Sequence, residues 1–163
     1  MSMPFMRALA AGDVAAAEAE VGATVPPDMP ADLADFLGFR IPDLAADPSI
    51  QPWLGRAIVL DTPPGRRVIG SVGFHAPPDA NGRVEIGYRI EPEHRGHGLA
   101  TEVASALLAW ARSEHGIRHF RASTAPDNVA SQAILARLGF RQVGTQMDEI
   151  DGLELVFDLD DPG

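Results

Sequence analysis

A strand, a glycine-containing loop and a helix follow one another without interruption between residues 84 and 116, and this succession constrains the fold more than any other part of the sequence. Apolar and polar residues alternate along the first segment, which predicts a half-buried strand. Its apolar positions are Val84, Ile86, Tyr88 and Ile90. The helix is expected to end near Gly116 and to carry one apolar stripe. The stripe consists of Leu99, Val103, Ala106, Leu107 and Trp110. A strand and a helix that each have one apolar side require a sheet covered by helices.

Shorter segments complete the pattern on both sides of this unit. Amphipathic helices are predicted over residues 13–21 and 31–39, and the prolines of this region are expected to keep them short. A further helix is predicted to begin at Asn128 and to end at Gly139, and a tight turn is predicted at Asp151-Gly152. The remaining strands are predicted at residues 57–60, 67–74, 118–122, 140–145 and 153–159. The order of elements predicts one mixed α/β sheet.

The composition excludes several chemistries. All 13 basic residues are arginine, and the chain of 163 residues contains neither lysine nor cysteine. Schiff-base enzymes, Gly-Lys-Ser/Thr phosphate loops, thiolate nucleophiles and cysteine metal sites are therefore excluded. The net charge of −10 argues against nucleic acid as a partner. Residues 95–141 nevertheless hold six arginines and three acidic residues, which suits a small phosphorylated ligand, although a solvated surface is the simpler explanation.

The loop from Arg95 to Ala100 is the first candidate binding site. It precedes a helix, whose unpaired N–H groups and dipole favour an anion, and its glycines let a ligand oxygen approach the backbone. A dinucleotide-binding loop is not indicated, because Thr101 is not the small residue required and the next strand ends without an acid. A pyrophosphate would fit this loop, and a tight turn without a ligand is the alternative.

Three segments resemble the GNAT superfamily of acetyl-CoA-dependent N-acetyltransferases. They are Glu85 to Glu102, Asn128 to Ser131 and Leu138-Gly139-Phe140. The family's phosphate loop, Arg/Gln-x-x-Gly-x-Gly/Ala, is matched at Arg95, Gly98 and Ala100. Within the superfamily the chain is most similar to the branch that includes the acetyltransferases of ribosomal-protein N-termini.

The resemblance, which covers residues 56–159, implies an α/β (α+β) fold with a single mixed, mostly antiparallel central sheet, splayed parallel middle strands and flanking helices. It also implies one GNAT-like domain over residues 1–163. In this domain residues 1–55 would be helices that cover the substrate, and residues 56–159 would form the sheet and the acetyl-CoA site.

Acetyl-CoA is the co-substrate that the resemblance implies, with no metal. Its pyrophosphate would be held by the backbone amides of Arg95, Gly96, His97, Gly98, Leu99 and Ala100. The end of the strand around Ile90 would pair with the pantetheine arm, and the strands of Tyr88 and Phe120 would splay apart to admit it. Asn128 would hydrogen-bond the arm from the facing helix.

The expected reaction is direct attack of a primary amine, on a protein N-terminus or a small molecule, on the acetyl group. Glu85 is the candidate base, and its alternative is a surface glutamate that pairs with Arg83 or Arg89. The family's usual acid is a tyrosine at the position of Leu135. The resemblance then points to Ser131 as the acid, because the ribosomal-protein branch has serine at this position; a plain polar residue on a helix is the alternative. The missing tyrosine also supports the alternative of a non-catalytic acyl-CoA-binding module.

The remaining expectations concern metals, partners and location. His94 and His97 lie three residues apart, but a tight turn need not bring their side chains together, so no metal site is expected. His75 is a candidate proton relay near the acceptor, and a histidine that is only solvated at a strand end is the alternative. No apolar window is long enough for a membrane span, and residues 1–10 lack the apolar core of a signal peptide. A cytoplasmic protein with no membrane partner is expected, and a homodimer is left open.

Overall fold

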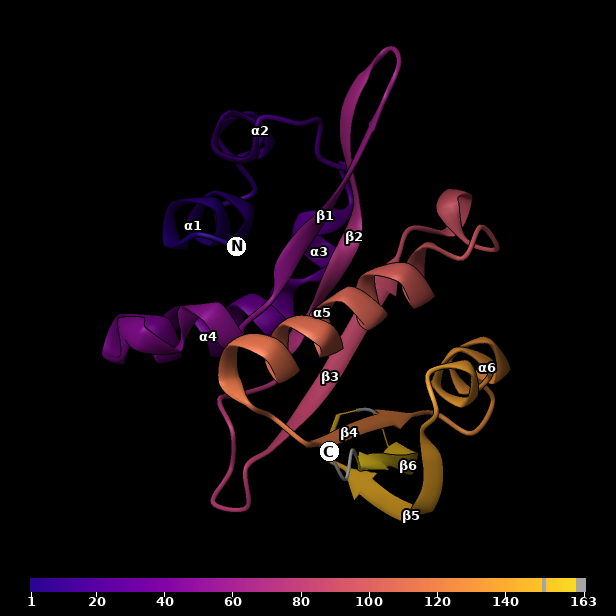
Figure 1. The fold of residues 1–163 in the computed structure, drawn as a ribbon. Helices are drawn as coiled ribbons and strands as arrows, with labels where there is room; N and C mark the ends of the chain where they lie inside the picture. The colour runs from indigo at the N-terminus through magenta and orange to yellow at the C-terminus, as the bar shows by residue number, and fades with distance from the viewer. Residues whose placement is uncertain (151, 161–163) are drawn as a thin grey trace. The chain divides into compact units, whose positions relative to one another are not determined.

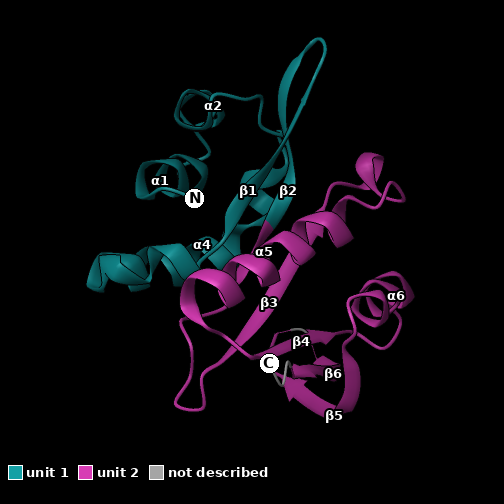
Figure 2. Ribbon diagram, viewed as in Figure 1, with its two compact units in different colours: residues 1–71 teal, residues 72–163 magenta. Residues whose placement is uncertain are grey.

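We describe residues 1–150 and 152–160 of a computed structural model of the chain (Figure 1). The predicted turn residue Asp151 lies outside the described residues. The backbone divides into two compact units, Met1–Ser71 and Val72–Gly163 (Figure 2). None of the described helices is long and apolar enough to cross a membrane.

Six strands form one sheet. They are β1 (Arg56–Thr62), β2 (Gly65–Phe74), β3 (Arg83–Ile90), β4 (His119–Thr124), β5 (Arg141–Asp148) and β6 (Gly152–Asp160). Their order is β1-β2-β3-β4-β6-β5, in which β3 and β4 run parallel whereas β4–β6 and β5–β6 are antiparallel. The predicted mixed sheet, mostly antiparallel with a parallel pair in the middle, is therefore confirmed.

Unit 1 holds the helices of the first third of the chain. They are α1 (Met3–Ala10), α2 (Val14–Val21), α3 (Met29–Asp32), α4 (Ala34–Ala46) and the 3-10 helix η1 (Pro48–Trp53). The side chain of Asp13 caps α2 by accepting a hydrogen bond from the amide of Ala16, as expected of a helix start. Buried side chains from α1, α2 and α4, including Phe5, Ala17 and Leu37, form the core of this unit.

Two predictions for unit 1 are corrected. The second helix was expected to end near Phe39, but α4 continues to Ala46 with Pro42 inside it. A proline removes only its own N–H donor, and the buried side chains of Leu37 and Leu44 hold the helix on both sides of it. Helix α1, capped by Ser2, was not predicted, because its 8 residues are too few to show a clear helical period of apolar side chains.

Unit 2 is built around α5 (Leu99–His115), which runs along β3 (Figure 1). It ends at Gly116, whose left-handed φ of 66° closes the helix as predicted. The predicted apolar stripe is wrong in detail, because Ala106 is exposed and Trp110 is only partly buried. The buried positions are Ala104, Leu107, Leu108 and Ala111. The buried face thus combines two alanines with two leucines and is rotated from the predicted stripe.

The second helix of unit 2, α6 (Val129–Arg137), begins after Asn128 as predicted. It is followed by Gly139, whose φ of 90° lets the chain turn into β5. A short 3-10 helix, η2 (Pro92–His94), leads from β3 into the loop before α5. The two helix starts, at Gly98 and Asn128, both belong to unit 2 and line the same cavity.

Candidate active site

The loop between β3 and α5 has the backbone geometry that an anion site requires. Gly96 and Gly98 have left-handed φ angles of 79° and 80°, and Gly98 is the N-cap of α5. A Cβ at either position would meet nothing within 4 Å, so the space beside these residues is open. Arg95 braces the loop, since its Nε donates to the carbonyl oxygen of Ile90 at 2.7 Å. The N-terminus of α5 thus presents its first amides beside an open space, where the helix dipole favours negative charge.

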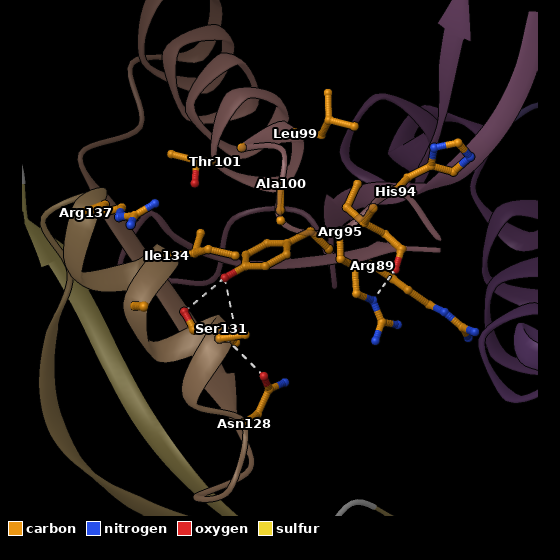
Figure 3. A pocket seen from close by; sticks show the side chains of 16 residues that line it. Arg89, His94, Arg95, Leu99, Ala100, Thr101, Asn128, Ser131, Ile134 and Arg137 are labelled. Atoms are coloured by element: carbon orange, nitrogen blue, oxygen red, sulfur yellow. Dashed lines mark hydrogen bonds between the residues drawn. The ribbon is translucent and has the colours of Figure 1, made fainter. Parts of the chain in front are cut away.

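This open space is part of a cavity of about 400 Å³ between the loop and α6 (Figure 3). The loop side of the wall consists of Tyr88, Arg89, Ile90, His94, Arg95, Gly96, Gly98, Leu99, Ala100 and Thr101. The helix side consists of Asn128, Ala130, Ser131, Ala133, Ile134 and Arg137. Three arginines make the lining basic, which suits a phosphorylated ligand.

Most of the predicted ligand-binding residues meet in this cavity. Those that line it are Ile90, Arg95, Gly96, Gly98, Leu99, Ala100, Asn128 and Ser131. His97 does not line it; its ring is exposed, with Nδ1 3.4 Å from the carbonyl oxygen of His94. Glu85 does not line it either. The sequence therefore identified both walls of the cavity.

Helix α6 contributes its first turn to the cavity. The Oδ1 atom of Asn128 accepts a hydrogen bond from the amide of Ser131 at 3.1 Å, so this side chain caps the helix. Figure 3 shows both residues on the helix wall, facing Arg95 and Ala100 across the cavity. Because Oδ1 serves the cap, a hydrogen bond from Asn128 to a ligand would come from its Nδ2 group.

Tyr88 is the functional candidate that sequence reasoning missed. Its hydroxyl lies 3.0 Å from Oγ of Ser131 and 3.4 Å from the Ser131 carbonyl oxygen. Burial raises the pKa of Tyr88 above its usual value, although the hydrogen bond with Ser131 opposes this shift. The available signal was that Tyr88 is the only tyrosine of the chain. Its place in an apolar alternation made it look like a core residue.

Helix spacing of three and then four residues predicts that Asn128, Ser131 and Leu135 share one stripe of α6. The structure instead buries Leu135, with 1% of its surface exposed, and gives the place in the cavity wall to Ile134. Consecutive side chains of an α-helix are rotated by about 100° about the helix axis, so neighbouring positions face different surroundings. Leu135, at the position expected to hold the catalytic tyrosine, therefore faces the core in this protein.

β3 and β4 pair over three residues and then separate. Their parallel register joins Arg83 to His119, Val84 to Phe120 and Glu85 to Arg121. No further pair follows among residues 83–90 and 119–124, all of which are described. The predicted splayed middle strands are confirmed, and they separate beyond Glu85.

Glu85 stands where the two strands begin to separate, and it is half-buried. Its Oε1 accepts a hydrogen bond from the Ser123 hydroxyl at 2.6 Å. The Nε2 group of Gln146 donates to Oγ of Ser123 at 3.2 Å and to Oε2 of Glu154 at 2.9 Å. An amide nitrogen can only donate, so the Ser123 hydrogen is directed to Glu85, which is held as an acceptor. The alternative of a Glu85 ion pair with Arg83 or Arg89 is not seen; Arg83 pairs with Asp79 at 3.2 Å.

Among the described residues that line the cavity, His94 is the one histidine. His75 is exposed, and its Nε2 would be 2.8 Å from a Cβ at Gly87, so its ring lies against β3 on the side that carries Glu85. Nε2 of His94 is 3.2 Å from the Glu93 carboxylate. Within residues 1–150 and 152–160, no three His, Cys, Asp or Glu side chains are grouped to hold a metal ion.

Comparison with known proteins decides the family. A sequence profile of the acetyltransferase (GNAT) domain matches residues 5–141. The chain belongs to the GNAT acetyltransferase family. Over 79 residues this GNAT chain is 39% identical to the uncharacterized N-acetyltransferase YoaA of Bacillus subtilis (strain 168), an alignment that covers 48% of the chain and 45% of YoaA. The alignment thus spans less than half the length of that relative.

Solved GNAT structures share the fold. The microcin C7 self immunity acetyltransferase MccE, in complex with acetyl-CoA and AMP, matches with a TM-score of 0.66 over 98% of this chain and 89% of that chain, at 20% identity. The ribosomal-protein-S5-alanine acetyltransferase from Vibrio fischeri matches with a TM-score of 0.63 over 82% and 73% of the two chains, at 18% identity. At these identities the likeness shows the fold alone.

GNAT acetyltransferases use acetyl-CoA, and the cavity of this chain has features that fit it. The open amides at Gly96 and Gly98 suit a pyrophosphate, and the lining arginines suit its charge. β3 and β4 are not paired with each other beyond Glu85, and an extended pantetheine arm could lie between them and hydrogen-bond to the backbone as an added strand does. The residue assignments themselves remain predictions.

Proposed function

We propose that this chain transfers the acetyl group of acetyl-CoA to a primary amine. The cavity between the Arg95–Ala100 loop and α6 is the observation that carries the proposal. It joins a helix N-terminus with open amides to a wall of hydroxyl groups, those of Tyr88 and Ser131. The first feature suits a pyrophosphate and the second suits the reacting end of the same ligand.

Acetyl-CoA would lie with its pyrophosphate at the amides of Gly96 to Ala100, beside Arg95 and Arg137. The pantetheine arm would then run along the end of β3, near Ile90, and Asn128 would donate to it from Nδ2. This placement brings the thioester to the point where β3 and β4 separate. Support comes from the register of these strands, which stops at Glu85.

Glu85 is the proposed base for the acceptor amine. It lies at the point of separation, and the Ser123 hydroxyl holds its carboxylate in place. A neutral amine must lose one proton as it attacks the acetyl carbonyl, and a carboxylate that already accepts hydrogen bonds can take that proton directly or through water. The proposed attack is direct, and the chain has no cysteine thiolate, the strongest nucleophile for carrying an acetyl group.

The acceptor is a primary amine of a protein N-terminus or of a small molecule. An amine is supported by the family and by YoaA, a named N-acetyltransferase. The structural neighbour from Vibrio fischeri is named for a protein N-terminal alanine, which makes peptide N-termini the first class to test.

Thiol release from acetyl-CoA tests the proposal. Peptides with N-terminal alanine or serine, spermidine and amino-acid amides are offered in turn, and wild type is expected to release free CoA with at least one of them. Glu85→Gln keeps the shape and the acceptor for Ser123 but removes the base, so kcat should fall by roughly 10²- to 10⁴-fold.

Glu114→Gln is the matched control, because Glu114 also accepts a serine hydroxyl, that of Ser113, but lies at the far end of α5. It should keep the wild-type rate. Equal rates of Glu85→Gln and wild type would remove Glu85 from the mechanism.

A non-catalytic acyl-CoA-binding module is the second candidate. One observation favours it: the position of the family's tyrosine is a buried leucine, Leu135, which supplies no proton. Such a module would bind acetyl-CoA in calorimetry but release no thiol with any amine.

A further inference from the structure

The hydroxyls of Tyr88 and Ser131 form a pair across the cavity. Tyr88 projects from β3, Ser131 from α6, and their oxygens are 3.0 Å apart although 43 residues separate them in sequence. Both residues line the cavity that we assign to acetyl-CoA. The hydrogen bonds at Ser131 are drawn in Figure 3.

A departing CoA thiolate needs a proton, and serine alone is a poor source of one. A serine hydroxyl that gave up its proton would become an alkoxide, a far stronger base than the thiolate it served. A phenol loses its proton near pH 10, much closer to the value of about 8.5 for an alkyl thiol. A serine hydroxyl that is hydrogen-bonded to a phenol can pass on the phenol's proton instead of losing its own.

We propose that Tyr88 is the source of the proton for the CoA thiolate and that Ser131 conducts this proton from Tyr88 to the sulfur. The inference rests on the proposed acetyl transfer and names its acid. Tyr88 on β3 would thus supply the proton, because Leu135, near the end of α6, has no hydroxyl to do so.

The proton movements balance in this scheme. The amine nitrogen bonds to the acetyl carbon, and Glu85 takes the amine's proton. The carbon–sulfur bond then breaks, the sulfur takes the hydrogen of the Ser131 hydroxyl, and the Ser131 oxygen takes the hydrogen of Tyr88. Free CoA thiol and the amide leave, Glu85 releases its proton to solvent, and the Tyr88 phenolate regains one from solvent.

The surroundings of Tyr88 suit this task. Burial raises the pKa of Tyr88, so the hydroxyl holds a proton to donate at neutral pH, and the hydrogen bond with Ser131 limits this rise. The charged and titratable groups that line the same cavity are Arg89, Arg95 and Arg137 with His94.

Tyr88→Phe, Ser131→Ala and the double variant test the relay with acetyl-CoA and with its selenium analogue as donors. Tyr88→Phe keeps the ring and removes one oxygen. With acetyl-CoA, each single variant should lower kcat by about 10- to 100-fold, at or below the general-acid range. The double variant should be no slower than the slower single variant, because both residues act in one chain of transfer. KM for acetyl-CoA should change little.

The selenium analogue separates acid catalysis from packing. Its selenolate is a much weaker base than a thiolate and leaves without a proton, so the variants should approach the wild-type rate with this donor. A loss of equal size with both donors would overturn the relay, since it would show a structural defect. An unaltered kcat of Tyr88→Phe with acetyl-CoA, or losses that multiply in the double variant, would overturn it as well.

The relay and the proposed function fail in different ways. If wild type releases no thiol with any amine, the proposed acetyl transfer is wrong. If wild type is active and Glu85→Gln is slow but Tyr88→Phe is not, only the relay is wrong.

Discussion

Replacing Gly98 with alanine should separate ligand binding from stability, because the same helix offers a matched control. Gly98 and Gly116 stand at the two ends of α5, with left-handed φ angles of 80° and 66°. A Cβ at either position would meet nothing within 4 Å. The only structural cost of alanine is therefore backbone strain, and it is similar at both ends.

The cost in stability follows from this geometry. A left-handed conformation costs a residue with a Cβ about 1–2 kcal/mol. Alanine also lowers the conformational entropy of the unfolded chain relative to glycine, and this stabilises the folded state by about 0.4–1 kcal/mol. Each variant should thus lose roughly 0.5–1.5 kcal/mol, and Tm should fall by about 1–6 °C at 2–4 °C for each kcal/mol.

The two variants should differ in their response to acetyl-CoA. Gly98 lines the cavity and Gly116 does not. A methyl group beside the amides would prevent a phosphate oxygen from reaching them, and a hydrogen bond to a charged group is worth about 1.5–3 kcal/mol. The Kd of Gly98→Ala should therefore rise by about 10- to 100-fold, at tenfold for each 1.4 kcal/mol. Gly116→Ala should keep the wild-type Kd.

Calorimetry and thermal unfolding measure both effects on the same samples. At a ligand concentration of about 100 wild-type Kd, acetyl-CoA should stabilise wild type and Gly116→Ala by about 2.7 kcal/mol. Gly98→Ala should gain less than about half of that. The assignment of the pyrophosphate site is refuted if Gly98→Ala binds acetyl-CoA as tightly as wild type, or if Gly116→Ala weakens binding by the same factor.

Three further predictions concern single residues. Because Tyr88 is the only tyrosine and burial raises its pKa, the ultraviolet titration of tyrosinate should have its midpoint above pH 10, and the unfolding free energy should fall as pH rises from about 10 towards that midpoint. Hydrogen bonds from Arg121 hold the pKa of Asp158 below its usual value, so this carboxylate stabilises the fold above about pH 4 and loses that effect as pH falls; urea unfolding of Asp158→Asn should show a flatter acid limb than wild type. Leu135→Ala should cost about 2–5 kcal/mol in urea unfolding because Leu135 is buried, with an unchanged Kd for acetyl-CoA, whereas an altered Kd would return Leu135 to the site.

Local patterns in the sequence were sufficient for the order of elements and for the loop wall of the site. The alternation from Val84 to Ile90 and the glycines before α5 depend only on neighbouring residues: side-chain direction repeats every two residues in a strand, and left-handed φ favours glycine. The start of α6 at Asn128 was equally local, because a cap bonds to an amide three residues away.

Two features of the site were decided only by the tertiary structure. Ser123 reaches Glu85 across 38 residues, and Tyr88 reaches Ser131 across 43. These contacts depend on which strands lie side by side and on the rotation of α6 about its axis. The same rotation places the Leu135 side chain in the core. Neighbouring residues of a helix point about 100° apart, so spacing alone did not decide which α6 residues face the cavity. Neighbouring residues alone were enough to predict the loop geometry at the start of α5. The packing of α6 against the sheet brings the hydroxyls of Tyr88 and Ser131 together there, because burial of the apolar side of that helix sets its rotation.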